Sequence, residues 1–408
     1  MTLFALIMAG VAASVATGLN LTRTDRHRSV AANIASQEMD IVRESSFTTL
    51  APRTITQTVG TVDYTVRRDL TWVSKSATSG PCDGNGGTPQ VLRVSVQVSW
   101  ADMNGIPPVQ SDSLLSPPVG AYDPNTGHIA VKVLDTNAAP QENAIVTVNG
   151  AQNKTLPTNT DGCAFFAFLP AGTYTVTLNT PGFVDRQSNA NPTQTLGVTI
   201  GQISSVQFDY DQAANIVATL TPTNGGTVPN DLAITLANSQ YLPNGQRMFT
   251  GTGPSRTLAN LFPSLEGYQA WAGECADADP AGIKIVGTTT YGPYWPGAAR
   301  DAGIAPPAGG SAAANVAVPS VNLTVKGPTG TPISGATVVA THATDNICAA
   351  GATHAVGTTN ASGQLVGVLP YGTWAISVTG RTAQSGSWPA LVLDPNVSST
   401  PSLQVAVN

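Results

Sequence analysis

The sequence predicts an α+β N-terminal region followed by an all-β remainder: one long helix packed on a small antiparallel sheet, then tandem Greek-key β-sandwich domains. Three observations support this prediction. Residues 1–51 contain no proline and change from an uncharged apolar stretch to an amphipathic helical pattern. Residues 52–116 alternate apolar and polar side chains, as half-buried strands do. Beyond residue 127 a block of strand-like sequence recurs, which indicates repeated domains.

Composition is consistent with several β-rich domains. The chain has 408 residues, and at roughly 100–200 residues per domain this length predicts two to four domains. Charged residues make up 10% of the chain, while 40 Gly and 30 Pro indicate turn-rich structure. The formal net charge of −6 provides no basic surface for phosphates, so nucleic-acid binding is not expected.

The first 21 residues form an uncharged, mostly apolar segment. At about 1.5 Å per helical residue, this segment is long enough to cross a hydrocarbon layer of roughly 30 Å. A secretory signal is the rival interpretation, but the segment lacks the positively charged start of such signals. The amphipathic pattern continues to Pro52, which predicts one helix over residues 1–51. A plain membrane anchor would not need that amphipathic extension.

The start Met1-Thr2-Leu3, the apolar run and the later Ala-Ala-Asn-Ile-Ala-Ser-Gln-Glu ending at Glu38 resemble mature type IV pilins and type II secretion pseudopilins. The resemblance implies that Met1 is the processed, N-methylated terminus and that residues 1–21 pack in a filament core. The family's glutamate at the fifth position is Ala5 here, so its salt bridge to a neighbour's N-terminal amine is missing. The packing residues that the resemblance implies, with small ones allowing close helix approach, are Leu3, Leu6, Ile7, Gly10, Ala13, Gly18 and Leu21.

Residues 52–116 are expected to form the sheet of the pilin head. Two strands should meet at a turn around Gly60, and residues 91–100 should form a third strand. In that third strand, alternation places residues 92, 94, 96, 98 and 100 on one face. A fourth strand is expected at residues 109–115. Such a meander, packed on the distal half of the helix, is what the pilin resemblance implies.

A turn-rich linker at residues 117–127 precedes three predicted sandwich domains: residues 128–213, 214–317 and 318–408. The first contains Leu169-Pro170-Ala171-Gly172-Thr173-Tyr174, and the last contains Leu369-Pro370-Tyr371-Gly372-Thr373-Trp374. The middle block matches this pattern more weakly, around Phe262-Pro263 and Tyr268. These blocks resemble the prealbumin-like, Cna-B-like or carboxypeptidase-regulatory-like sandwich, which implies a stalk-like module and no particular activity.

Four cysteines are disulfide candidates: Cys82, Cys163, Cys275 and Cys348. They are far apart and have no metal-ligand spacing, so a zinc site is not expected. Three pairings are possible, and proximity along the chain favours Cys82 with Cys163 and Cys275 with Cys348. Two disulfides indicate an oxidising compartment.

The remaining candidates for chemistry are few. Glu274, Asp277 and Asp279 could bind calcium, although a solvated acidic loop is the favoured interpretation. No catalytic motif stands out, so no catalytic, cofactor-binding or metal-binding residues are expected and the chain is not expected to be an enzyme. Exposed aromatics between Tyr291 and Trp295 could form a contact patch, although packing on their own domain explains them as well.

Taken with these observations, the pilin resemblance implies a structural subunit of an extracellular type IV pilus. Its expected partners are other copies of itself in a helical filament, the pilus assembly machinery, prepilin peptidase, and the cytoplasmic membrane before assembly. The sandwich domains would lie on the filament surface, where they could serve adhesion to a surface or host ligand. The alternatives are a membrane-anchored monomeric adhesin and a minor or tip pilin.

Overall fold

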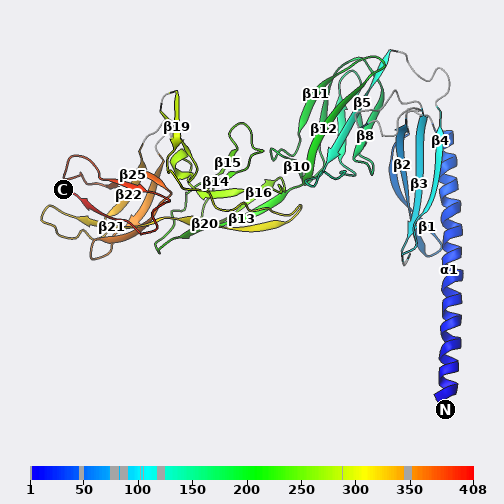
Figure 1. Ribbon diagram of the computed structural model, residues 1–408, viewed down its shortest axis with the longest axis horizontal. Helices are drawn as coiled ribbons and strands as arrows, with labels where there is room; N and C mark the ends of the chain where they lie inside the picture. Colours follow the sequence, from blue (N-terminus) through cyan, green and yellow to red (C-terminus); the bar gives the residue numbers. More distant parts are fainter. Residues whose placement is uncertain are drawn as a thin grey trace. The chain divides into compact units, whose positions relative to one another are not determined.

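The computed structural model is mainly β, with one N-terminal helix (Figure 1). It describes residues 2–45, 50–73, 82, 91–101, 103, 105–116, 125–286, 288–343 and 352–408, and for residues 2–20, 285 and 286 it describes the backbone only. The chain divides into two compact units. Unit 1 comprises Met1–Pro181 and Ala190–Tyr210, and unit 2 comprises Gly182–Asn189 and Asp211–Asn408.

Unit 1 begins with the helix and the head sheet. Helix α1 spans Thr2–Glu44. The sheet has the antiparallel order β1-β2-β3-β4, formed by β1 (Arg53–Val59), β2 (Val62–Val73), β3 (Val91–Trp100) and β4 (Val109–Leu115). These strands confirm the predicted meander. The alternating side chains of β3 from Leu92 to Trp100 are buried, as the pattern predicts.

The distal part of α1 packs on this sheet because its apolar residues recur at three- and four-residue steps. Ala31, Ile34, Ala35, Met39 and Val42 are buried together with the apolar face of β2 and β3. The helix ends at Glu44, earlier than the predicted residue 51. The Ser45 amide already shares the carbonyls of Ile41 and Val42, at 3.1 and 3.2 Å. The Ser45 hydroxyl also donates to the Ile41 carbonyl, at 2.7 Å, and serine favours caps and turns over helix interiors, which explains the early end.

The second domain of unit 1, sandwich 1, packs two sheets face to face. One sheet places β5 between β8 and β12, and the other has the order β11-β9-β6-β7. Strand β5 begins inside the predicted linker 117–127, of which residues 117–124 lie outside the described set. The strands are β5 (Thr126–Leu134), β6 (Ile145–Asn149), β7 (Lys154–Pro157), β8 (Cys163–Pro170), β9 (Gly172–Leu178), β11 (Thr193–Val198) and β12 (Ile203–Gln212).

Unit 2 contains two further sandwiches and the short strand β10 (Phe183–Asp185). Sandwich 2 consists of β13 (Ala214–Pro222), β14 (Ile234–Ala237), β15 (Gln246–Phe249), β16 (Ser255–Leu261), β17 (Gln269–Ala272), the 3-10 turn η1 (Ala276–Ala278), β18 (Ile283–Val286), β19 (Thr289–Pro293) and β20 (Ser311–Val318). Sandwich 3 consists of β21 (Ser320–Lys326), β22 (Thr337–His342), β23 (Thr353–Thr358), β24 (Gln364–Val368), β25 (Gly372–Val378), β26 (Ala390–Leu393) and β27 (Ser402–Ala406).

The three sandwiches share one topology. In each, the first strand pairs in parallel with the last: β5 with β12, β13 with β20, and β21 with β27. The same first strand also pairs antiparallel with β8, β16 or β24. The sequence repeat therefore corresponds to a structural repeat, including the weakly matching middle block. Only Pro319 separates β20 from β21, so sandwiches 2 and 3 are joined without a linker.

One turn explains why the first and last blocks are so similar in sequence. The Asn159 side chain accepts hydrogen bonds from the amides of residues 161 and 163, both at 3.0 Å. The Asn360 side chain accepts equivalent bonds from residues 362 and 364, both at 2.9 Å. In both turns the third residue after the asparagine has a positive φ, which glycine adopts without strain. These residues are Gly162, with φ +66°, and Gly363, with φ +71°.

The aromatic residue that ends the repeated motif anchors each core. Tyr174 donates its hydroxyl to the carbonyl of Pro170 at 3.1 Å, and Trp374 donates its indole N–H to the carbonyl of Pro370 at 3.0 Å. Tyr268, in the weaker middle block, donates to the carbonyl of Phe262 at 2.6 Å. Each ring is buried and its single polar group is satisfied, as a buried Tyr or Trp requires.

Candidate functional site: the N-terminal helix and the domain junctions

The predicted packing residues lie along the N-terminal half of α1. Met1 is outside the described residues, and for Leu3 to Gly18 only the helical backbone is described. Leu21, the last of the predicted residues, is 62% exposed. Figure 1 shows α1 continuing past the end of the sheet toward its N-terminus. His27 and Val30 are among the described side chains of α1 that contact the head.

Membrane insertion of this helix stays a prediction. Among the side chains that the structure describes, no helix has the length and apolar character needed to cross a membrane.

A buried ion-pair cluster fixes α1 on the head. Glu38, which is 3% exposed, accepts hydrogen bonds from Arg53 Nε at 2.9 Å and Arg68 Nη1 at 3.1 Å. Arg68 also donates to the carbonyl of Ala51 at 2.7 Å. Burial lowers the pKa of Arg68, and the Glu38 carboxylate opposes this shift. Because removing one partner of a buried pair costs about 3–5 kcal/mol, the cluster resists displacement of the helix.

From the sequence, Glu38 was noted only as the end of the motif that resembles the pilins, and no role in anchoring the helix was predicted. A signal for its role was available, because Glu38 lies four residues after Ile34 on the face that becomes buried.

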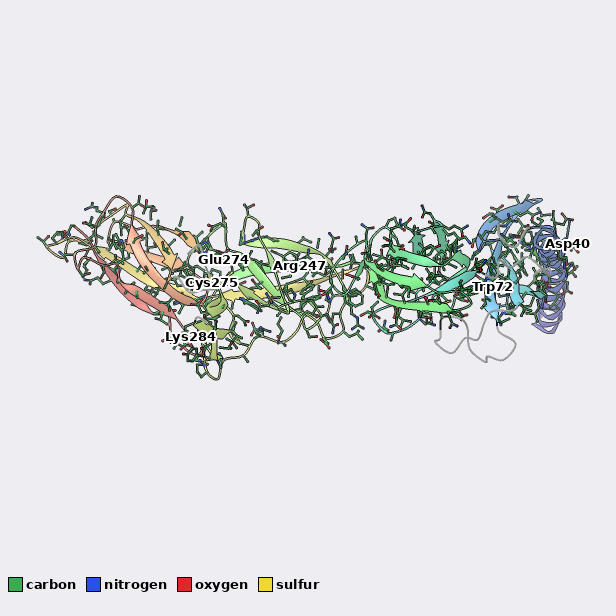
Figure 2. The ribbon with its side chains drawn as sticks, turned by 90° about the horizontal axis from the view of Figure 1, so that it is seen from above. Asp40, Trp72, Arg247, Glu274, Cys275 and Lys284 are labelled. Atoms are coloured by element: carbon green, nitrogen blue, oxygen red, sulfur yellow. A yellow bond between two sulfur atoms is a disulfide. The ribbon has the colours of Figure 1, made fainter. Side chains whose placement is uncertain are left out.

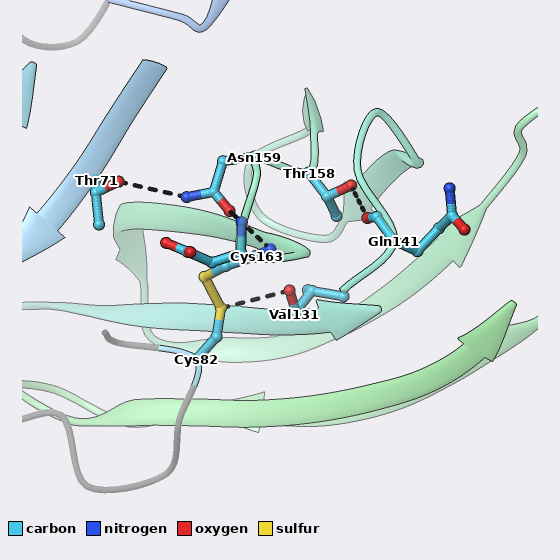
Figure 3. The surroundings of a disulfide bond; sticks show 8 residues. Thr71, Cys82, Val131, Gln141, Thr158, Asn159 and Cys163 are labelled. Carbon is cyan, nitrogen blue, oxygen red and sulfur yellow. Dashed lines mark hydrogen bonds between the residues drawn. A yellow bond between two sulfur atoms is a disulfide. The ribbon is translucent and has the colours of Figure 1, made fainter. Parts of the chain in front are cut away.

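A disulfide between Cys82 and Cys163 covalently links the head to sandwich 1 (Figure 3). This is the neighbour pairing that proximity along the chain favours, and the two Cα atoms lie 5.8 Å apart. Beside it, the Asn159 side chain donates to Thr71 Oγ1 of the head at 3.3 Å. The Asx turn of sandwich 1 is therefore also part of its junction with the head.

An aromatic cluster extends this junction from sandwich 1. Phe168 lies in a bulge of β8 with φ +57° and meets Trp72 of the head edge to face, at 5.6 Å between centroids. Its amide donates to His128 Nδ1 at 3.3 Å. His128 is buried and stacks on Phe165, so burial lowers its pKa to about 4. The neutral His128 therefore accepts the Phe168 amide and stabilises the bulge, in which the Phe168 ring packs against Trp72 of the head.

In unit 2, a buried carboxylate joins sandwiches 2 and 3. Asp277, in η1, lies 2.7 Å from Nε2 of His342 and accepts the Thr373 amide at 3.2 Å. The next carboxylate, Asp279, stays within sandwich 2 and binds both the Nε and Nη2 atoms of Arg300, at 2.8 and 2.6 Å. The favoured interpretation of this segment as a solvated acidic loop is wrong for both residues. Only Glu274 is exposed.

A hydroxyl group completes the same junction. Ser320, 1% exposed at the start of β21, donates to the carbonyl of Gly225 at 2.8 Å and accepts the Asn224 amide at 2.9 Å. Val368 of β24 is fully buried in the core of sandwich 2. Sandwiches 2 and 3 therefore share both core and polar contacts, so the two domains are packed against each other at this junction.

Cys275, Asp277 and His342 place one potential metal-ligand atom each within 4.8 Å of one another. Cys275, which follows Glu274 in unit 2 (Figure 2), is disulfide-bonded, so no thiolate is available for a metal. Its predicted partner Cys348 lies outside the described residues.

The aromatic segment after β18 is only partly exposed. Tyr291 is 53% exposed, whereas Trp295 is 8% exposed and donates its indole N–H to the carbonyl of Asp277 at 2.7 Å. Trp295 therefore belongs to the junction region, and a contact patch made of all these aromatics is not present.

Comparison with known proteins identifies one of these domains. Residues 128–224 match the model of the carboxypeptidase regulatory-like domain, which agrees with the sandwich resemblance for this block. The match covers sandwich 1 and the first strand of sandwich 2. No curated protein sequence matches the chain.

Matches to solved structures cover much of the chain, but their sequence identities and TM-scores are low. The Bacillus anthracis TIE protein is 12% identical over 89% of this chain and 75% of its own, with a TM-score of 0.22. BcpA, the major pilin subunit of Bacillus cereus, is 11% identical over 69% of this chain and 99% of its own, with a TM-score of 0.20. GBS52, the minor pilin of Streptococcus agalactiae, is 11% identical over 69% and 97%, with a TM-score of 0.18. At these TM-scores the matches carry no argument about function.

Proposed function

We propose that this chain is a non-enzymatic structural subunit of an extracellular filament of the type IV pilus kind. Copies of the chain associate through the apolar N-terminal half of α1, and the sandwich domains are displayed outward. Before assembly the same helical segment resides in the cytoplasmic membrane.

One observation carries this proposal: the distal half of α1 is packed on the head, whereas the proximal half continues past the sheet. The distal half is anchored to the head by an apolar face and by the buried Glu38 cluster. The proximal half continues past the sheet and has an uncharged sequence up to Leu21. A helix that needed only to tether surface domains to a membrane would gain nothing from being fixed so firmly to a folded head.

Electron microscopy of sheared surface material tests the proposal. Fibres that contain this chain are expected from cells that make the natural protein. Gly10→Arg or Gly18→Arg should abolish them, because a long charged side chain prevents close helix packing and is costly in an apolar bundle. Gln37→Arg is the matched control, since residue 37 is exposed on the part of α1 that covers the head.

Three outcomes separate the proposal from its rivals. Unchanged fibres in both glycine variants contradict polymerisation through this helix. Detergent-extracted monomers without any fibres favour the membrane-anchored adhesin, and fibres with only a few copies favour a minor or tip subunit. Mass spectrometry of assembled chains should find Met1 N-methylated.

A further inference from the structure

A cavity of about 280 Å³ opens where sandwich 3 meets sandwich 2, within unit 2. Its walls come from three places: the β26–β27 loop (residues 394–401), the β24–β25 turn at Tyr371, and the junction residues around Pro319. The volume is close to the lower end of the roughly 300–1,000 Å³ of small-molecule sites, which often lie between domains. One small ring-sized group would fill it.

Three anchors make the loop wall rigid. The Asp394 side chain accepts the Asn396 amide at 2.8 Å, which forms an Asx turn at the start of the loop. The Asn396 side chain donates to the carbonyl of Pro296 at 3.3 Å. At the other end, Thr400 Oγ1 accepts the Asn224 side chain at 2.9 Å. The site therefore requires little ordering when a ligand binds, which favours affinity.

The cavity presents polar groups that the protein itself does not use. Within the described part of the chain, no hydrogen bond involves the hydroxyls of Tyr371, Ser398 or Ser399, which line the cavity. Asp394 uses one carboxylate oxygen in the Asx turn, which leaves the other available. Burial, and then the charge of Asp301, raises the pKa of Tyr371, so its hydroxyl remains a neutral donor at physiological pH.

The lining contains one carboxylate and no lysine or arginine, so it disfavours anionic ligands. An aromatic ring beside a carboxylate and two hydroxyls suits a ligand with an apolar face and a rim of hydroxyl groups.

From this geometry we infer that the cavity binds one neutral saccharide unit, at the terminus of a longer glycan. The sugar face packs on Tyr371, Asp394 accepts hydrogen bonds from ring hydroxyls, and Ser398 and Ser399 complete the rim. The open side of the cavity lets the rest of the glycan continue into solvent. This binding does not depend on polymerisation, although it would supply an adhesive role to a filament.

The repeat indicates that Tyr371 is not required by the fold. Ala171 occupies the same place in the sandwich 1 motif, where it is exposed and the turn still forms. The alanine in sandwich 1 makes Tyr371→Ala a conservative test of the site.

Saturation-transfer NMR on the full chain in detergent micelles tests the inference, with methyl glycosides of glucose, galactose and mannose as probes and sialic acid as the anionic comparison. At least one neutral glycoside should receive saturation. Tyr371→Ala should weaken its binding by about tenfold or more, because the stacking face is lost. Asp394→Asn should weaken it less, since asparagine keeps the Asx turn. Tyr291→Ala, an exposed tyrosine outside the cavity, should leave binding unchanged.

The inference is overturned if none of the three neutral glycosides binds, if sialic acid binds better than all of them, or if Tyr371→Ala binds like the natural chain. Thermal unfolding of each variant verifies that the fold is retained. The assay uses monomers, so a negative result leaves filament formation unaffected, and filament loss in the glycine variants leaves sugar binding unaffected.

Discussion

Sandwich 1 and sandwich 3 are built on the same repeated motif, yet they pack on the preceding domain through different residues. Sandwich 1 packs on the head, and sandwich 3 packs on sandwich 2. In each sandwich a valine amide of the first strand donates to the carbonyl of the Asx-turn glycine: Val133 to Gly162 and Val325 to Gly363, both at 2.8 Å. These equivalent bonds define how the residues of the two first strands correspond. In this alignment His128 corresponds to Ser320. Both are buried, and both lie at the junction with the preceding domain.

A second pair of positions follows the same rule. Phe168 and Val368 each precede the Leu-Pro of the repeated motif. Phe168 packs with the core of the head, and Val368 belongs to the core of sandwich 2. The comparison teaches that one end of the sandwich is the docking end in both units. The turn and the core are shared, whereas the docking residues differ because each must match a different neighbour.

The largest expected effect comes from truncating the aromatic anchor of either repeat. Trp374→Ala should destabilise unit 2, and Tyr174→Ala unit 1, each by about 3–5 kcal/mol, because both rings are almost fully buried. Chemical denaturation followed by near-ultraviolet circular dichroism measures each loss. A much smaller loss in only one variant would mean that the two cores are not equivalent.

Alanine at the glycine of the Asx turn should cost about 3 kcal/mol through combined strain and clash. Gly363 has φ +71°, and an added Cβ would lie 2.7 Å from the Val325 carbonyl. Gly330→Ala is the matched control in the same sandwich, because Gly330 has φ +78° but open space around it. The control should cost only about 1 kcal/mol in unfolding free energy. Equal losses would show that the backbone conformation alone requires glycine at this turn.

His128 should make the stability of unit 1 depend on pH, with no counterpart at Ser320. Burial lowers the His128 pKa to about 4, whereas the unfolded side chain titrates near its ordinary value of 6.5. Above pH 6.5 the residue is neutral in both states and has no effect. As the pH falls from 6.5 to 4, the unfolded chain binds the proton first, so about 3 kcal/mol of stability is lost by pH 4.

Urea denaturation at several pH values measures this slope. His128→Asn keeps a hydrogen-bond acceptor for the Phe168 amide and serves as the reference. The difference in slope between the natural chain and this variant isolates the histidine from the carboxylates. Parallel slopes would contradict the assignment of His128 as the titrating group.

Much of the architecture follows from local pattern. The four strands of the head and the sandwich repeats were predictable because burial imposes period-two alternation and because the Asx turn demands specific residues. The end of α1 was not predictable, since Ser45 competes for helix carbonyls in a way that no periodicity records. The acidic segment was misjudged for a related reason. Asp277 and Asp279 look like solvated charges until His342 and Arg300 are placed beside them.

By itself, the sequence determined the start of the long helix, the strands of the head and the repeats, because propensity, spacing and turn chemistry act between residues close in the chain. Only the tertiary structure decided which residues dock one domain on the next: His128 with Phe168 in unit 1, and Asp277 with His342 in unit 2. Those contacts join residues up to 65 positions apart. Their energies depend on burial and geometry, which exist only once the chain has folded.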